Sequence, residues 1–307
     1  MDIKEQLKLK NPGEIAERII EFIKNQVDIL NKEGIIIGLS GGIDSALGAF
    51  LSVKALGKEK VLALFMPERD SSSKSEKDAK LVADLLGIKF KKINLTPILR
   101  TIGIYKLYPP TFLIPKKIQE MYALKKYKDL GSNNETSLLK NLKGGKGEEE
   151  LKKGIAYYRI KHRLRMVTEY YYGELNNYLV IGNCNKTEKL TGFFVKHGDS
   201  AADVEPISSL FKTQVRELSS FLGVPNEIIK KAPSPDLIPG ITDEISLGMK
   251  LEILDQILYG LEKGMSEEEI KRQTDTTEKK IQYVKELIKY SFHMRKLPPS
   301  PDLHDLL

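Results

Sequence analysis

Short apolar runs alternate with helical patterns along the first hundred residues. IIIGLS (35–40) and KVLALFMP (60–67) are continuous apolar runs of the kind that is buried on both faces of a parallel sheet, and KFKKINL (89–95) alternates as a third strand. Between them, IDSALGAFLSVKALG (43–57) and SEKDAKLVADLLG (75–87) have helical patterns that close at glycines. This alternation predicts right-handed βαβ units, and therefore an α/β fold with a doubly wound parallel sheet flanked by helices.

The same criteria assign the flanking segments. Asn11 and Pro12 predict the start of a helix that Gly34 terminates. LKKGIAYYRIKHRLRMVTEYYYGELN (151–176) predicts another helix, and NYLVIGN (177–183) a further buried strand. The C-terminal part is mainly helical. Ser266 and Glu269 form a capping box there, and a long closing helix spans 276–296.

The pattern breaks down between residues 105 and 153. This Lys-rich segment contains Pro-Pro, Gly-Gly and Asn-Asn pairs. Some helix is expected around 118–124, whereas 131–150 has the composition of a mobile loop. It is either a disordered insertion or a lid over a site, and the first interpretation is favoured for its middle. We therefore expect residues 1–307 to form a single domain that carries this insertion.

Composition narrows the setting only slightly. The net charge of +7 suits an anionic ligand, but lysine and glutamate are interleaved and 30% of the residues are charged, which is typical of a well-solvated surface. The single cysteine, Cys184, excludes a disulfide framework and is expected to be a small core residue. No segment has the length and apolarity of a membrane span, and the first residues are too polar for a signal peptide. We expect a cytoplasmic protein.

The stretch GLSGGIDS (38–45) carries the candidate chemistry, and two interpretations compete for it. It matches the G-x-S-x-G pattern of hydrolases, in which a serine is the nucleophile. Only 39 residues precede Ser40, however, and none of the four histidines lies in an obvious strand-to-helix loop with an acidic partner. We therefore reject the hydrolase interpretation.

A phosphate-binding loop explains more of these residues. Gly41 and Gly42 let the backbone turn tightly and direct successive N–H groups at an anion, and the helix that starts at Ile43 adds its N-terminal partial charge. Ser40 and Ser45 supply hydroxyl groups, while no Walker-type lysine follows. The carboxylate of Asp44 would repel a phosphate unless a cation lies between them, and Mg²⁺ is the natural choice.

These residues resemble a known superfamily. Residues 40–45 match the S-G-G-x-D-S pyrophosphate loop of the N-type ATP pyrophosphatases, which have an adenine nucleotide alpha-hydrolase-like fold. The stretch 178–225, together with KKAPSPDL (230–237) and TDEISLG (242–248), resembles the NAD synthetases. The resemblance covers roughly the whole chain except the insertion.

The resemblance implies roles for individual residues. Asp44 and Glu188 would bind magnesium, and Asp44, Lys212 and Ser234 would be catalytic. The implied ATP-binding residues are Gly38, Ser40, Gly41, Gly42, Ile43, Asp44, Ser45, Asn183, Lys212 and Ser234. The implied residues for deamido-NAD are Arg159, Arg163, Lys196, Asp199, Asp203 and His293. Asn183, Asn185 and Arg159 depart from the residues usual in the family, which leaves room for a different acceptor.

The implied reaction is the amidation of deamido-NAD to NAD with ammonia and ATP. It would pass through an acyl-adenylate and release AMP and pyrophosphate. No glutaminase domain is predicted, so the ammonia would be free or come from a partner, and the resemblance implies a homodimer. The alternatives are another carboxylate acceptor, a tRNA-modifying enzyme whose Lys-rich insertion binds RNA, or a nucleotide-binding regulator without catalysis. A thiolation enzyme generally needs paired cysteines, so nucleic acid is an unlikely partner.

Overall fold

The centre of the molecule is a four-stranded parallel sheet. The computed structural model describes residues 2–108, 135–145, 148–234 and 241–301, together with residues 118, 121 and 125. The strands are β1 (Gly34–Gly38), β2 (Val61–Phe65), β3 (Lys89–Lys92) and β4 (Tyr178–Ile181), in the order β3-β2-β1-β4. In the register, Ile36 of β1 lies beside Leu62 on one side and Val180 on the other. Because β1 lies between β2 and β4, its isoleucines are fully buried.

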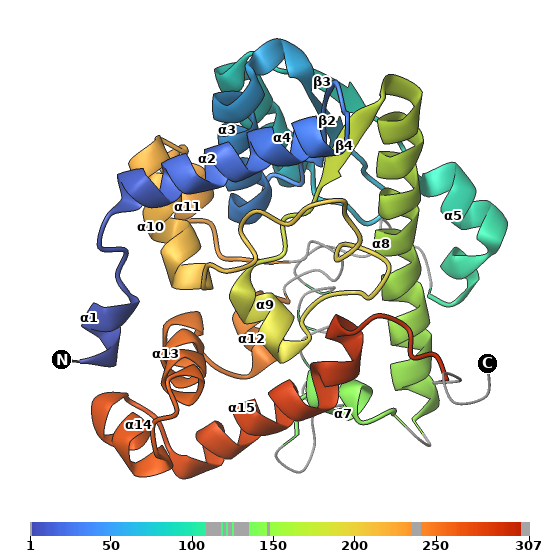
Figure 1. Ribbon diagram of the computed structural model, residues 1–307. Coiled ribbons are helices and arrows are strands. Elements are labelled where there is room, and N and C mark those ends of the chain that lie inside the picture. The colour runs from blue at the N-terminus through green and yellow to red at the C-terminus, as the bar shows by residue number, and fades with distance from the viewer. Residues whose placement is uncertain are drawn as a thin grey trace.

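Helices cover both faces of the sheet. Alternate residues of β1 point to opposite faces, so the strand contributes side chains to a separate core on each side. The bounds of these helices are Pro12–Ile29 (α2), Ile43–Leu56 (α3), Ser73–Leu86 (α4), Thr96–Ile102 (α5), Glu149–Asn176 (α8) and Lys212–Leu222 (α10). Ile35 and Ile37 belong to the core beneath α2, α3, α4 and α10, whereas Ile36 belongs to the core beneath α5 and α8. Figure 1 shows α2 crossing above the sheet and the long helix α8 running beside it. The predicted doubly wound α/β fold is confirmed.

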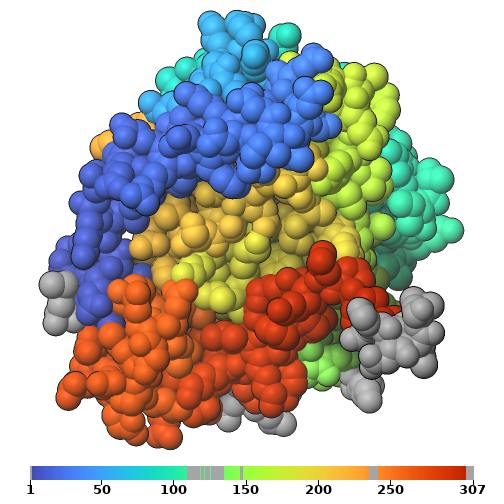
Figure 2. All heavy atoms as spheres, in the orientation of Figure 1, coloured from blue at the N-terminus to red at the C-terminus, as the bar shows by residue number. Residues whose placement is uncertain are grey.

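A second apolar core lies among the C-terminal helices. It joins α1 (Ile3–Leu7) to α13 (Leu251–Glu262), α14 (Glu267–Gln273) and α15 (Glu278–Ser291). In the space-filling view, the chain between residues 192 and 211 fills the surface between α2 above and α15 below (Figure 2). The short elements are α9 (Lys186–Thr191), α11 (Asn226–Ile229), α12 (Asp243–Leu247) and 3₁₀ turns at Lys58–Lys60, Ile104–Lys106 and Phe292–Arg295. None of the described helices combines the length and apolarity needed to cross a membrane.

The predicted caps are confirmed with one exception. The side chain of Asn11 accepts a hydrogen bond from Glu14 N at the start of α2, and Ser266 and Glu269 form their capping box. Gly34, however, does not terminate the first helix, because α2 ends at Ile29. Gly34 instead opens β1, where a Cβ atom would lie 2.5 Å from the carbonyl oxygen of Lys60. A close approach of strands requires this glycine.

The prediction of a mobile loop over 131–150 is wrong for its described residues. Ser137–Leu142 form helix α7, which Thr136 caps by accepting a hydrogen bond from Leu139 N. Leu139 is 1% exposed and packs in a small apolar cluster with Leu287 and Met294. The polar composition of the segment concealed Leu139 and Leu142, the two buried leucines that anchor α7. The helix expected around 118–124 lies largely outside the described residues.

Candidate functional site

The loop between β1 and α3 has the backbone shape of an anion site. Gly41 has a φ of +77°, and a Cβ atom there would lie 2.5 Å from the carbonyl oxygen of Ser75, so only glycine fits. Gly42 is the N-cap residue of α3 and no side-chain cap bonds the first turn. The N–H groups at this end of a 14-residue helix are therefore available to a ligand.

Side chains hold this loop in place. The hydroxyl oxygens of Ser40 and Ser45 are 3.0 Å apart, and Ser40 Oγ accepts a hydrogen bond of 3.2 Å from Gly42 N. Lys231 Nζ donates to the Gly41 carbonyl oxygen over 3.2 Å and pairs with Asp78 on α4 over 2.6 Å. The loop is thus fixed before any ligand binds, which reduces the entropy cost of binding.

A buried lysine lies beside the loop. Lys212 is 3% exposed, and its Nζ lies 2.5 Å from Asp44 Oδ2, 3.2 Å from Glu188 Oε1 and 3.9 Å from Asp243 Oδ2. Burial is the largest single influence and by itself lowers the pKa of this lysine, but the carboxylates together outweigh burial and raise the pKa above its usual value. Lys212 is therefore charged at neutral pH, and it draws the acidic side chains of three elements to one point.

The acidic side chains are oriented by short-range hydrogen bonds. Asn185 caps α9 by accepting from Glu188 N over 3.0 Å, and its Nδ2 donates to Asp44 Oδ1 over 2.9 Å. Burial raises the pKa of Glu188 to about 8 and that of Asp243 to about 6, although Lys212 opposes both shifts. A raised pKa means that the negative charge of a carboxylate is not fully compensated in its surroundings. A second positive charge would therefore be stabilised at this point.

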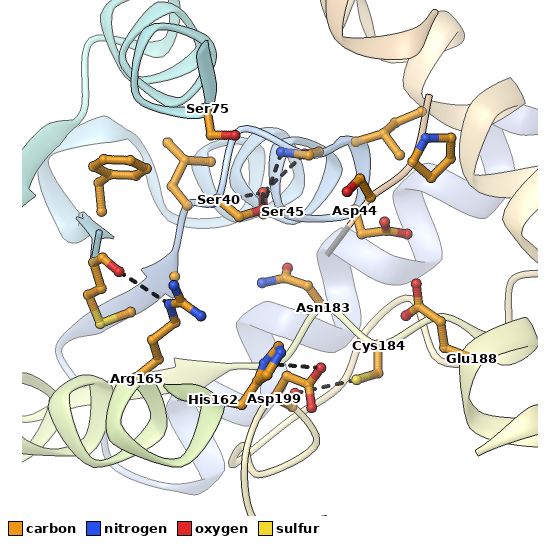
Figure 3. Close-up of a pocket in the computed structure, with 18 of the residues that line it drawn as sticks. Ser40, Asp44, Ser45, Ser75, His162, Arg165, Asn183, Cys184, Glu188 and Asp199 are labelled. Carbon is orange, nitrogen blue, oxygen red and sulfur yellow. Dashed lines mark hydrogen bonds and ion pairs between the residues drawn. The ribbon is translucent and has the colours of Figure 1, made fainter. Parts of the chain in front are cut away.

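The loop and the acidic side chains line one cavity of about 320 Å³. Figure 3 shows Ser40, Asp44 and Ser45 at one side of it, with Asn183, Cys184 and Glu188 facing them. The predicted residues that line the cavity are Gly38, Ser40, Gly42, Ile43, Asp44, Ser45, Asn183, Glu188, Asp199, Lys212 and Ser234. Burial raises the pKa of the Cys184 thiol well above its usual value, in agreement with a core residue that is not a nucleophile.

Most of the residues predicted for the acceptor lie outside this cavity. Arg163 Nη2 donates to the carbonyl oxygen of Lys196 over 3.4 Å, and Lys196 Nζ donates to that of His293 over 3.2 Å, so these three lie together. Arg159 Nη2 donates to Asn141 Oδ1 on α7 over 3.3 Å. Asp203 Oδ2 accepts from the backbone N of Val180, over 2.8 Å, which is a structural bond. Of the predicted acceptor residues, Asp199 alone lines the cavity within the described part of the chain.

Several residues of the cavity were not predicted. Lys231, Asp243, His162 and Glu169 all line it. Asp243 had a signal in the sequence, since it begins the helix in the TDEISLG stretch. Lys231 lies in the KKAPSPDL stretch, three residues before the predicted ATP-binding residue Ser234. His162 and Glu169 belong to a helix whose charged residues gave no sign of which face is turned to the sheet.

Comparison with known proteins assigns the chain to a family. The family model for NAD synthase matches residues 15–111 and 118–298. The chain belongs to the NAD synthase family. The NH(3)-dependent NAD(+) synthetase of Thermotoga neapolitana is 45% identical over 290 residues, which are 94% of this chain and 97% of that protein. That of Methanocaldococcus jannaschii is 41% identical over 290 residues, with the same coverage.

Solved structures agree with this membership. The NH3-dependent NAD synthetase from Campylobacter jejuni has a TM-score of 0.69 at 26% identity, covering 96% of this chain and 100% of that chain. The NMN synthetase from Francisella tularensis has a TM-score of 0.70 at 27% identity, covering 95% of this chain and 98% of that chain. The parallel sheet and its flanking helices form the adenine nucleotide alpha-hydrolase-like fold of this family.

Gly41 provides a direct test of the phosphate loop. Gly41→Ala should weaken nucleotide binding at least tenfold, because the positive φ alone costs a side chain about 1–2 kcal/mol and the Ser75 carbonyl blocks the new methyl group. Gly42→Ala is the matched control: its φ is −93° and the nearest atom to the added methyl is Ser40 Oγ at 3.3 Å. Titration calorimetry with ATP measures both. Equal effects of the two substitutions would contradict the assigned loop geometry.

Proposed function

We propose that this protein is an ammonia-dependent NAD synthetase that uses ATP to amidate deamido-NAD in the cytoplasm. The observation that carries the proposal is the convergence of Asp44, Glu188 and Lys212 beside an open helix N-terminus, in a chain that belongs to the NAD synthase family. Relatives 41–45% identical over most of the chain are NH(3)-dependent NAD(+) synthetases. We also propose that the chain acts as a single domain and as a homodimer.

The β- and γ-phosphates of ATP would bind the N–H groups of the loop at residues 40–45. Lys212 would turn its ammonium group from the carboxylates to a phosphate, and Ser234, which lines the cavity, lies in reach of the same ligand. Arg and Lys side chains and helix N-termini stabilise phosphate in this way, because each supplies fixed donors. Asn183 lines the cavity on the opposite wall.

The residues present fit a magnesium ion that shares its ligands with the nucleotide. Asp44 and Glu188 both reach one cation, the Lys212 ammonium, so their oxygens converge on a single point. Among the described residues, no group of three Asp, Glu, His or Cys side chains forms a metal site by itself. Mg²⁺ usually binds one or two carboxylates and completes its shell with water and phosphate oxygens. When bound, it would offset negative charge on the departing pyrophosphate.

The reaction requires two displacements. A carboxylate does not react with ammonia directly, since oxide would have to leave. The acceptor carboxylate would therefore attack the α-phosphorus, forming an acyl-adenylate while the bond to pyrophosphate breaks. Ammonia would then attack the acyl carbon and displace AMP, leaving the amide. The protein contributes placement of the groups and stabilisation of charge.

The basic cluster of Arg159, Arg163 and Lys196 is our candidate for the acceptor side. The pKa of Arg159 is lowered by burial and, secondarily, by the positive charge of Arg163. Two guanidinium groups held near each other without a described carboxylate to balance Arg159 favour an anionic ligand. The diphosphate of a dinucleotide has the required charge.

A mononucleotide acceptor is the second candidate. The structural similarity to the Francisella tularensis NMN synthetase favours it, as do the departures at Asn183, Asn185 and Arg159. The amidation chemistry would be the same, because both acceptors present a pyridine carboxylate. Turnover with deamido-NAD and with nicotinate mononucleotide at equal concentration decides between the two.

The reaction class is tested by the products and by the acidic pair. With ATP, Mg²⁺, deamido-NAD and ammonium, the wild-type protein should form AMP and NAD in equal amounts. Asp44→Asn and Glu188→Gln should each lower turnover about 10²–10³-fold, because each removes charge stabilisation at the phosphates. Asp84→Asn and Glu149→Gln are the matched controls, with side chains 62% and 76% exposed. Formation of ADP, or near wild-type rates in the first two variants, would contradict the proposal.

Arg159 tests the acceptor side. Arg159→Asn should raise the KM for deamido-NAD about fivefold or more and leave the KM for ATP within twofold, since a charged contact contributes roughly 1 kcal/mol or more. Arg18→Asn, at a side chain 78% exposed, is the control. Steady-state kinetics with each substrate varied measures the effect. Equal changes in both constants, or no change in either, would show that Arg159 only contributes to the packing of α8 against α7.

A further inference from the structure

The carboxyl group of Glu169 occupies an unusual position in the cavity. Glu169 lies on α8 and lines the cavity where β1 ends. A Cβ atom built on Gly38 would lie 2.0 Å from Glu169 Oε1, so this oxygen rests against the strand backbone. The carboxyl group lines the cavity together with Arg165 and Asp199. It is therefore accessible to whatever enters the cavity.

The surroundings of Glu169 differ from the phosphate end of the cavity. Met66, Pro67 and Met166 supply apolar wall, and Arg165, one helical turn before Glu169, is held by a hydrogen bond of 3.2 Å from its Nε to the Met66 carbonyl oxygen. Figure 3 shows Arg165 on the opposite side of the cavity from Asp44 and Glu188. An apolar wall with a few oriented polar groups is typical of a site for a flat heterocycle.

The length of a nucleotide connects these two ends. If the β- and γ-phosphates lie at the N-terminus of α3, the nucleoside must extend into another part of the same cavity. The side that contains Asp44 and Glu188 is strongly acidic and is needed by the phosphates and their cation. The apolar end beside Gly38 and Met66 remains for the base, and Glu169 places a carboxyl group at that end.

We propose that Glu169 recognises the nucleotide base and selects adenine, donating a hydrogen bond from its neutral carboxyl group to adenine N1 and accepting one from the N6 amino group. This inference rests on the proposed use of ATP and adds the residue that distinguishes ATP from GTP. Guanine carries a donor at N1 and an acceptor at O6, which is the reverse pattern. A site built for one hydrogen-bonding pattern rejects the other, because buried polar groups are then left unpaired.

The protonation state of Glu169 agrees with this geometry. Burial raises the pKa of Glu169 to about 8, Arg165 opposes the shift and Asp199 adds to it. These two are the charged groups that act on the carboxyl group among the described residues. Since the group is protonated below this pKa, it has one donor and one acceptor at neutral pH. An ionised carboxylate would have acceptors only and would suit the two N–H groups of guanine instead.

Two substitutions test the proposal. Glu169→Gln keeps one donor and one acceptor but does not titrate, whereas Glu169→Met keeps the volume and removes both. At pH 7 the Met variant should raise the KM for ATP tenfold or more and reduce the preference for ATP over GTP by the same factor. The Gln variant should stay within about threefold of wild type. The KM for deamido-NAD should be unchanged in both.

The pH dependence separates recognition from packing. Between pH 7 and pH 9 the wild-type carboxyl group loses its proton, so its KM for ATP should rise relative to that of the Gln variant, which keeps its donor. A wild-type and a Gln variant with parallel pH profiles would overturn the proposal, as would an unchanged ATP/GTP preference in the Met variant or an effect confined to deamido-NAD. If the Met variant fails to fold, the Gln comparison still decides. If the wild-type protein forms no NAD, the proposed function is refuted separately. Direct titration of wild type and variants with ATP and GTP then still tests whether Glu169 selects the base.

Discussion

The arrangement of the site depends on the buried ammonium group of Lys212. Three carboxylates surround it, from the first turns of α3 and α12 and from α9. Burying a charge is costly unless it is paired, and removing one partner of such a pair leaves the other uncompensated. Lys212 itself is anchored, because its backbone N donates to Thr187 Oγ1, which donates in turn to the fully buried Asp255. The cluster therefore ties the loop between β1 and α3 to the C-terminal helices.

The same cluster connects the fold to the proposed chemistry. Asp44 and Glu188, which we propose as magnesium ligands, are held together by Lys212, which we propose binds phosphate. A nucleotide with its magnesium ion would supply both the positive charge that the carboxylates need and the negative charge that Lys212 needs. This proposed exchange of partners would keep every buried charge compensated, so a preorganised site could still admit a strongly charged ligand.

The sequence predicted the parts of the site that depend on local order. The Gly-rich turn between an apolar strand and a helix determines its own backbone shape, so the turn after β1 and the helix start at Ile43 were identified correctly. The helix caps at Asn11 and Ser266 are likewise local. The loop expected over 131–150 failed because the burial of Leu139 depends on helix α15, more than a hundred residues away.

Long-range pairing was the other part that the sequence concealed. Lys161 is fully buried and pairs with Glu68 at 2.9 Å and Asp70 at 2.8 Å, which joins the loop after β2 to α8. A lysine in a charged helix gives no sign of such a partner. The same holds for Glu169, whose neighbour Gly38 is identified only once α8 is placed across the sheet.

The most direct test of the central claim follows the oxygen atoms of the acceptor. Deamido-NAD labelled with ¹⁸O in its carboxylate would be converted with ATP, Mg²⁺ and ammonium, and the products analysed by mass spectrometry. If the carboxylate attacks the α-phosphorus, one labelled oxygen leaves with AMP and the other stays in the amide of NAD. Label in inorganic phosphate, or AMP without label, would contradict the acyl-adenylate route and with it the role assigned to the Lys212 site.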